Sequence, residues 1–132
     1  MGELVFVFGT IRRSQPRHYL LGESNFVAEG IIEGFDLYYV NNMFPGIVEG
    51  NGKVFGEVYE TDEKTLLKLD EAENVLKIKG RDFGLSKRVK LKVKTKDGRE
   101  LDAWCYIFIQ NIENSTKIES GDWVEFSKTL NR

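Results

Sequence analysis

The sequence predicts an α+β fold: a mixed, partly closed β-barrel with one main helix and short helices. Strand-like runs of apolar and aromatic residues occupy most of the chain. Glycines interrupt several of these runs, as they do in curved sheets. Only residues 62–76 have the spacing of a substantial amphipathic helix. The 132 residues contain no linker, repeat or low-complexity tract, which predicts a single domain over residues 1–132.

Composition limits the kinds of partner. Nineteen Lys and Arg residues against 21 Asp and Glu residues give a net charge of −2, without the basic excess that nucleic acids or anionic membranes require. No apolar run approaches the ~20 residues needed to cross a bilayer, and the pattern of a signal peptide is absent. We therefore expect a cytoplasmic protein with no nucleic-acid or membrane partner. One cysteine, Cys105, and one histidine, His18, offer no metal-ligand spacing, which predicts no metal site.

The first strand is predicted over residues 4–8, where five apolar residues in a row suit a strand buried on both faces. Gly9 follows and permits a sharp turn, because it lacks the Cβ atom that restricts the backbone. Such a turn can present successive backbone N–H groups to one side and hold a carboxylate or phosphate. The same residues are also compatible with a turn that only ends a core strand. Ser14 to Gly22 then predicts a short helix with Ser14 at its N-cap.

The next segments predict a curved sheet. Residues 26–40 are strand-like, and residues 41–46 predict a turn. Residues 47–48 and 54–59 continue the sheet, and Asn51-Gly52 between them predicts a hairpin, since this dipeptide favours tight turns between apolar runs.

Residues 62–76 form the main predicted helix, and acidic residues in its first turn suit the positive end of the helix dipole. A step of ~100° per residue places four leucines in one broad arc: Leu66, Leu67, Leu69 and Leu76. Glu73 falls within the same arc, so the periodicity that builds the core face turns this carboxylate inward. Burial raises the pKa of a carboxyl group toward the range useful for proton transfer. Fraying before Glu73, or an ion pair with Lys or Arg, would instead give it a purely structural role.

The remaining segments complete the sheet. In order, the predicted elements are a loop over 77–87, an alternating strand over 88–94, a hairpin turn at 97–98, a central strand over 101–109 and a short helix ending near residue 130. Trp104 and Tyr106 share one face of the central strand, where they line either a pocket or the core.

Six short strings, in this order, resemble the gamma-glutamylcyclotransferase-like family. They are most similar to its small gamma-glutamylamine cyclotransferase branch and to related bacterial and archaeal proteins. The resemblance covers nearly the whole chain, and its specificity comes from the order of the strings. They are Phe8-Gly9-Thr10-Ile11-Arg12-Arg13, Phe44-Pro45-Gly46-Ile47, Val54-Phe55-Gly56-Glu57-Val58-Tyr59, Leu69-Asp70-Glu71-Ala72-Glu73, Ala103-Trp104-Cys105-Tyr106 and Ser120-Gly121-Asp122-Trp123.

The resemblance implies an enzyme that acts on a small-molecule γ-glutamyl substrate without a cofactor. The α-amine of the substrate would attack its own side-chain carbonyl, close a 5-oxoproline ring and release a free amine. Glu73 matches the family's general acid/base. The substrate loop matches Phe8, Gly9, Thr10 and Ile11. Four further side chains are expected at or near the pocket: Arg12, Asp70, Arg88 and Tyr106.

Departures from the family pattern bear on the identity of the substrate. Phe8 replaces the usual Tyr, Ser14 and Arg17 stand where many members carry Gly and Asn, and the segment before Arg88 lacks a usual Tyr. Three other interpretations therefore stay open: a non-catalytic module that binds a carboxylate ligand, an enzyme of the same fold acting on another γ-glutamyl metabolite, and a structural or oligomerising β-protein.

Overall fold

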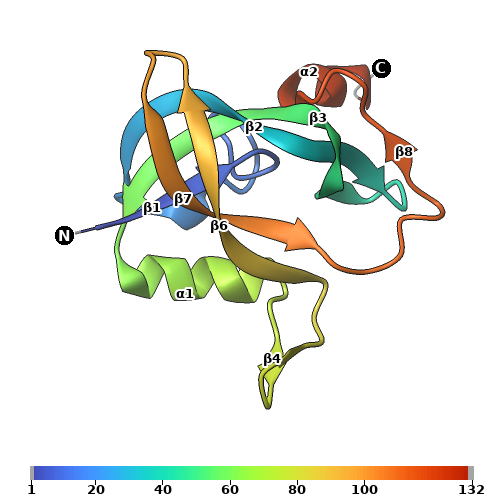
Figure 1. Cartoon of the computed structure of the whole chain (residues 1–132), viewed down its shortest axis with the longest axis horizontal. Coiled ribbons are helices and arrows are strands. Elements are labelled where there is room, and N and C mark those ends of the chain that lie inside the picture. The colour runs from blue at the N-terminus through green and yellow to red at the C-terminus, as the bar shows by residue number, and fades with distance from the viewer. Residues whose placement is uncertain (1, 131–132) are drawn as a thin grey trace.

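The elements of the chain are arranged around a β-barrel (Figure 1). The computed structural model describes residues 2–130. In chain order the elements are β1 (Glu3–Val7), η1 (His18–Leu21), β2 (Asn25–Val40), β3 (Phe44–Thr61), α1 (Glu63–Ala72), β4 (Lys77–Ile78), β5 (Arg81–Asp82), β6 (Ser86–Thr95), β7 (Glu100–Phe108), β8 (Thr116–Lys117), α2 (Trp123–Ser127) and η2 (Lys128–Leu130), where η marks a 3-10 helix.

Five strands close the barrel in the order β3-β1-β7-β6-β2, because β2 also pairs with β3. β1 pairs in parallel with β7 and antiparallel with β3, so the sheet is mixed. β8 adds a short strand beside β2. The prediction of a mixed barrel with one main helix and short helices is confirmed, and the β2–β3 pairing makes the barrel closed.

β2 and β3 form one long hairpin. The turn between them uses two asparagines, at positions 41 and 42, which both have positive φ, a conformation that asparagine tolerates better than most residues. The predicted hairpin at Asn51-Gly52 is wrong, because residues 44–61 form a single strand. A Cβ atom on Gly52 would lie 2.6 Å from Oδ1 of Asp36 on β2. The glycine that resembled part of a turn therefore permits the close approach of two strands.

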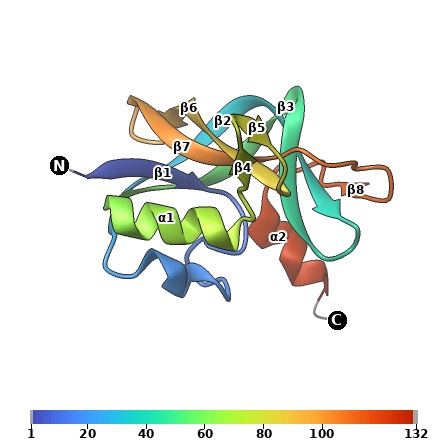
Figure 2. The ribbon, with the colours of Figure 1, turned by 90° about the horizontal axis from the view of Figure 1, so that it is seen from below.

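Buried side chains form two clusters on either side of β1. Phe6 belongs to the cluster inside the barrel, whereas Val5 and Val7 belong to the cluster between the barrel and α1. The prediction of a first strand buried on both faces is confirmed. Figure 2 shows α1 running alongside β1. Leu66 and Leu69 of α1 complete the second cluster.

α1 is shorter than predicted. Its N-cap residue, Asp62, accepts a 2.7 Å hydrogen bond from the backbone N–H of Thr65, which satisfies one of the free donors of the first turn. The helix ends several residues early, since Asn74 has a φ of 56°. As a result Leu76, expected in the core, lies beyond the helix and is 49% exposed. Leu67, also expected in the core, lies within α1 but is turned by about 100° from the buried Leu66 and is 58% exposed. No helix among residues 2–130 is both long enough and apolar enough to cross a membrane.

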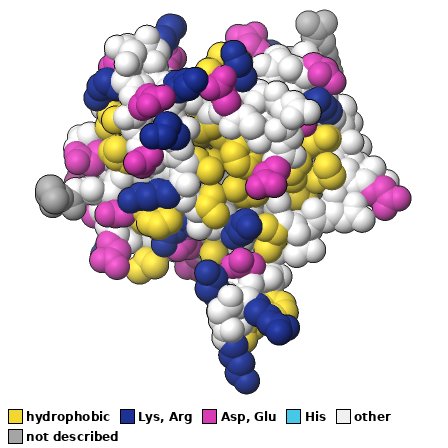
Figure 3. All heavy atoms as spheres, in the orientation of Figure 1, with side chains coloured by type: hydrophobic (Ala, Val, Ile, Leu, Met, Phe, Trp, Pro, Cys, Tyr) yellow, Lys and Arg dark blue, Asp and Glu magenta, His cyan; other side chains and the backbone are white. Residues whose placement is uncertain are grey.

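The segment predicted as a loop after α1 contains a small hairpin, β4–β5, which projects from the barrel in Figure 1. Figure 3 shows hydrophobic and basic side chains together on this projection. Ile78 and Phe83 are about half exposed. The base of the hairpin is tied to the end of α1, because the backbone N–H of Leu85 donates to the carbonyl oxygen of Asn74 at 2.9 Å.

The short helix predicted near the end of the chain is present as α2 and η2. Trp123 on α2 is buried in the barrel cluster, and Phe126 packs against it. The indole Nε1 of Trp123 also donates to Oε1 of Gln15 at 3.0 Å. These contacts join the end of the chain to the segment that follows β1.

Candidate active site

A pocket lies where the loop after β1 meets the start of β3 and the end of α1. It has two adjoining lobes with volumes of about 30 and 120 Å³. Both lobes are lined by Phe8, Arg17, Phe44, Pro45, Glu73 and Tyr106. The smaller lobe adds residues 9–11 of the loop, and the larger lobe adds Leu85, Ser86 and Phe108. The structure therefore brings the predicted substrate loop and the predicted acid/base residue to one cavity.

Glu73 stands at the C-cap of α1, where its backbone N–H still donates to the carbonyl oxygen of Leu69 at 2.9 Å. Although the helix ends at the preceding residue, the side chain remains in the pocket. Its surroundings remove most of its hydration, which raises the pKa of Glu73, while the positive charge of Arg17 acts in the opposite direction. A carboxyl group in such surroundings can exchange protons with a substrate near neutral pH.

In the loop at residues 8–11, backbone carbonyl oxygens hold the loop in place, while several backbone N–H groups have no acceptor in the described part of the protein. The carbonyl oxygens of Gly9 and Thr10 accept hydrogen bonds at 3.0 and 2.9 Å from the backbone N–H groups of Arg12 and Arg17. Among residues 2–130, the backbone N–H groups of Gly9, Thr10 and Ile11 donate to no protein acceptor. Consecutive free N–H groups are the donors that bind a carboxylate in a backbone concavity.

The exit of this loop is anchored by a carboxylate that the sequence analysis did not single out. Glu57 on β3 is only 2% exposed. It accepts hydrogen bonds from Nε of Arg12 at 2.6 Å, from the backbone N–H of Arg13 at 2.9 Å and from the hydroxyl of Tyr59 at 3.1 Å. In the sequence, the one indication of this role was that Glu57 is a charged residue within a strand of mainly apolar residues. Its partners Arg12 and Arg13 could not be identified, because they lie more than 40 positions away.

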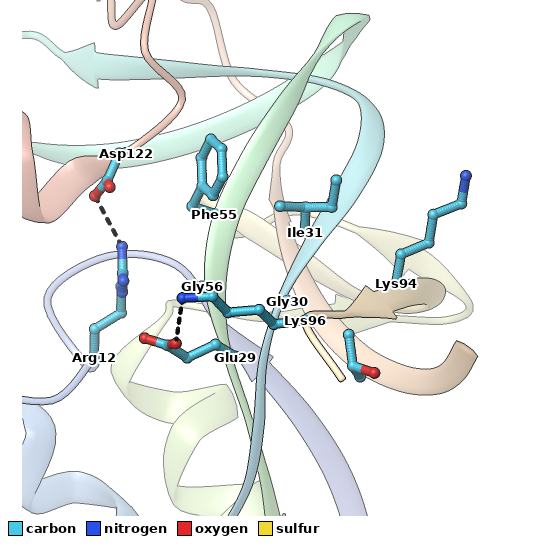
Figure 4. A pocket seen from close by; sticks show the side chains of 10 residues that line it. Arg12, Glu29, Gly30, Ile31, Phe55, Gly56, Lys94, Lys96 and Asp122 are labelled. Carbon is cyan, nitrogen blue, oxygen red and sulfur yellow. Dashed lines mark hydrogen bonds and ion pairs between the residues drawn. The ribbon is translucent and has the colours of Figure 1, made fainter. Parts of the chain in front are cut away.

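Arg12 does not line this pocket. Its guanidinium pairs with Glu57 and, at 3.0 Å, with Oδ1 of Asp122. It borders a different hollow of about 400 Å³ beside Phe55, shown in Figure 4. This hollow is larger than the Glu73 pocket, but the charged side chains drawn there are already engaged with protein partners, as the Arg12–Asp122 and Lys96–Glu29 contacts in Figure 4 illustrate. We therefore take the Glu73 pocket as the candidate active site.

Asp70, Arg88 and Tyr106 form a polar network behind the pocket. The hydroxyl of Tyr106 donates to Oδ1 of Asp70 at 2.6 Å. Arg88 donates from Nη2 to Oδ2 of Asp70 at 3.2 Å, and its Nε forms an ion-pair contact with Oδ1 at 2.8 Å. Burial, reinforced by the carboxylate of Asp70, raises the pKa of Tyr106. Tyr106 alone of the three lines the pocket, and the network joins β6 and β7 to α1, whose C-cap residue is Glu73.

Arg17 is the second functional candidate that sequence reasoning missed as a site residue. It lines both lobes and donates from Nη2 to the carbonyl oxygen of Ala72 at 3.1 Å. The sequence indicated Arg17 only as a position where many members of the family carry Asn.

Comparisons with known proteins identify the family and the fold of the chain. The model of the family described as "Gamma-glutamyl cyclotransferase, AIG2-like" matches residues 5–125. The chain is 31% identical over 124 residues to the gamma-glutamylcyclotransferase family protein YtfP of Escherichia coli, which covers 94% of this chain and 98% of that protein. A related protein of Citrobacter rodentium is 32% identical over 121 residues, covering 92% of this chain and 95% of that one.

The solved structures that are similar to this one include the following two. The crystal structure of an uncharacterised protein from Pyrococcus horikoshii superposes with a TM-score of 0.74 at 28% identity, covering 97% of this chain and 95% of that chain. The solution structure of Escherichia coli YtfP superposes with a TM-score of 0.67 at 31% identity, covering 94% of this chain and 98% of that chain.

Proposed function

Because the chain belongs to the gamma-glutamyl cyclotransferase, AIG2-like family, we propose that it converts γ-glutamyl amines or peptides into 5-oxoproline and a free amine. One observation carries this proposal: the desolvated carboxyl of Glu73 shares a small pocket with a loop whose backbone N–H groups are free. One group suits a proton transfer and the other suits the binding of a substrate carboxylate.

The reaction needs the substrate to be held in a ring-closing geometry. In the proposed complex, the loop N–H groups of residues 9–11 bind the α-carboxylate, and the α-ammonium group lies against Glu73. Holding the amine beside the γ-carbonyl carbon replaces a bimolecular encounter with an intramolecular one, for which effective molarities reach ~10⁵–10⁸ M.

Glu73 then moves one proton twice. It removes a proton from the α-ammonium group, and the resulting amine forms a bond to the γ-carbonyl carbon. The protonated Glu73 gives that proton to the amide nitrogen, the carbonyl double bond re-forms and the carbon–nitrogen bond to the leaving amine breaks. The ring nitrogen still carries a second proton, which it loses to the departing amine, so the lactam N–H is neutral and the amine leaves as an ammonium ion. The atoms balance without water: one γ-glutamyl amide gives one 5-oxoproline and one amine.

The test is to measure the release of 5-oxoproline from a panel of γ-glutamyl amines and γ-glutamyl dipeptides. For Glu73→Gln we expect kcat/KM to fall by about 10²–10⁴-fold, the usual contribution of a positioned proton-transfer group. Glu71→Gln, an exposed position on the same helix, is the matched control and should retain wild-type activity. For the wild type, kcat/KM should fall on the acid side with a midpoint above the ordinary pKa of glutamate, because burial raises the pKa of Glu73.

Near-wild-type turnover by the Glu73→Gln variant would remove Glu73 from the mechanism. Thermal stabilisation by γ-glutamyl compounds without any release of 5-oxoproline would instead identify the non-catalytic carboxylate-binding module.

A further inference from the structure

Arg17 is held between the two parts of the candidate site. Its backbone N–H donates to the carbonyl oxygen of Thr10 at 2.9 Å, and its Nη1 lies 3.4 Å from Oγ1 of the same residue. Its Nη2 donates to the carbonyl oxygen of Ala72, the last residue of α1. The guanidinium therefore spans the gap between the loop with free N–H groups and the helix end that carries Glu73.

The charge of Arg17 forms no ion pair with a carboxylate of the residues that the structure describes. Arg12 and Arg88, which are also partly buried, each form an ion pair with an acidic side chain. By contrast, no carboxylate oxygen among residues 2–130 lies within 4.0 Å of a guanidinium nitrogen of Arg17. Glu73 shares the pocket with Arg17 but stays outside this distance. A partly buried arginine with spare donors is suited to an external anion, because its planar fork matches a carboxylate.

We propose that Arg17 is a specificity-determining residue that binds a carboxylate of the substrate. This inference rests on the proposed function and extends it. It restricts the substrate class to γ-glutamyl compounds that bring a carboxylate against the guanidinium while the γ-amide lies beside Glu73.

Two parts of a γ-glutamyl compound could supply that carboxylate. The smaller lobe, which contains the loop, would place the α-carboxylate of the glutamyl group near Arg17. The larger lobe, which contains Leu85 and Ser86, would place there the carboxylate of an amino acid that leaves as the amine. Arg17 lines both lobes, so the experiment has one arm for each source.

Three substrates separate these sources: γ-glutamyl-alanine, γ-glutamyl-ethylamine, which lacks the leaving-group carboxylate, and the α-carboxamide of γ-glutamyl-ethylamine, which also lacks the glutamyl α-carboxylate. Each is measured with the wild type, Arg17→Gln and Arg17→Lys. Arg13→Gln is the control, because it removes the same positive charge from a nearby position. The exposed side chain of Arg13 forms an ion pair with Glu29 outside the pocket.

We expect Arg17→Gln to lower kcat/KM about 10–100-fold for substrates that carry the recognised carboxylate, the range of a hydrogen bond to a charged group. For the substrate that lacks this carboxylate, Arg17→Gln should change kcat/KM little. The loss of the guanidinium and the loss of the substrate carboxylate are then non-additive, as expected for two groups that interact directly. Arg17→Lys should recover part of the loss, because it restores the charge without the fork. The Arg13→Gln control should behave as the wild type.

The substrates for which Arg17→Gln lowers kcat/KM show which carboxylate Arg17 binds. A loss confined to γ-glutamyl-alanine assigns the leaving-group carboxylate, and a loss that persists with γ-glutamyl-ethylamine but not with its α-carboxamide assigns the glutamyl α-carboxylate. An equal loss with all three substrates would overturn the proposal and leave Arg17 as a structural residue.

A binding measurement keeps this proposal separate from the catalytic one. If the wild type released no 5-oxoproline from any substrate, the proposed function would fail, but Arg17 could still be tested with L-glutamate as the probe. L-glutamate should raise the unfolding temperature of the wild type and of Arg13→Gln, and should raise that of Arg17→Gln much less. An equal rise in all three proteins would contradict carboxylate binding by Arg17.

Discussion

At the scale of single residues, Gly9 shows how a position can be important for a reason that the sequence does not reveal. The sequence suggested that Gly9 permits a sharp turn. The structure shows in addition that a Cβ atom at Gly9 would lie 2.5 Å from Cγ of Pro45. Pro45 begins the opposite wall of the pocket, so the missing side chain lets two pocket walls approach each other.

Gly9→Ala should therefore disturb substrate binding more than proton transfer. The added methyl group must displace Pro45 or the loop, and overpacking of this kind typically costs about 1–3 kcal/mol. We expect KM to rise roughly tenfold or more, with a smaller change in kcat. Steady-state kinetics with the best substrate of the panel would measure this, and an unchanged KM would argue against the loop as the binding element.

Residues of the site differed in how well the sequence could predict them. Glu73 was accessible, because both its position in the helical period and a short string pointed to it. Glu57 also stands in one of the six strings, but neither its role nor that of Arg17 could be predicted, since both roles depend on long-range contacts. Glu57 acts on Arg12, which is 45 positions away, and Arg17 bonds to Ala72, which is 55 positions away. A local pattern contains no information about such pairs.

At the scale of elements, Glu57 connects β3 to the segment that leaves β1. Its carboxylate receives the side chain of Arg12 and the backbone of Arg13, so the loop is held at its exit by one buried group. Because a loop that is already held in place loses less conformational freedom when a ligand binds, this anchor should contribute to affinity as well as to stability.

Glu57→Gln tests the anchor. The amide keeps the shape of the side chain but loses the negative charge opposite Arg12. Removal of one member of a buried ion pair typically lowers the free energy of unfolding by about 3–5 kcal/mol. Here we expect a loss of about 2–3 kcal/mol, because Arg12 still forms its ion pair with Asp122. Urea unfolding would measure the loss, and KM should rise in parallel. Glu29→Gln, at an exposed ion pair, should change stability by well under 1 kcal/mol. A destabilised Glu57→Gln variant with unchanged KM would separate the anchor from substrate binding.

The end of α1 shows why element boundaries were predicted less well than elements. The helical period suggested an end near residue 76, but the carbonyl oxygen of Asn74 accepts hydrogen bonds from the backbone of Leu85 and Ser86. Gly84 permits this contact, since a Cβ atom there would collide with that same carbonyl oxygen. The position of Glu73 at the end of the helix therefore depends on residues that follow ten or more positions later.

At the scale of the whole molecule, the sequence predicted the type of barrel but not its closure. Runs of apolar residues and interrupting glycines indicated a curved mixed sheet, which the structure contains. Closure depends on β2 pairing with both β3 and β6. The register of β2 against β3 shifts twice, between Phe26 and Ala28 and between Glu33 and Phe35. Such irregularities bend a strand. The second lies at Gly34, one of the glycines that interrupt the predicted strand, whereas no local pattern in the sequence indicated the first.

The candidate site also has an effect on the stability of the whole molecule. Burial raises the pKa of Glu73 above its value in the unfolded chain, so the folded state binds this proton more tightly. The contribution of Glu73 is therefore most favourable below the unfolded pKa and is lost as the pH rises through the folded pKa. Above the unfolded pKa, the desolvation of this carboxyl therefore lowers the free energy of unfolding relative to its value at acidic pH.

Glu73→Gln should accordingly be more stable than the wild type at about pH 7, with an unfolding temperature a few degrees higher. The gain should shrink as the pH falls and disappear below about pH 4, where a glutamate in the unfolded chain is mostly protonated. Thermal unfolding at several pH values would measure this, with the exposed Glu71→Gln variant as the unaffected control. A lower unfolding temperature at both pH values would show that the carboxylate stabilises the fold.

The central position of β1 has a consequence for how the protein is made. β1 pairs with β3 and with β7, and its contact with β7 joins Val5 to Trp104. During synthesis, the apolar first strand therefore leaves the ribosome long before β7 exists, and contacts of such sequence separation form slowly. The loop that follows β1 can reach its final shape only when most of the chain has emerged, so a nascent chain interrupted before β7 would carry the substrate loop without a formed pocket.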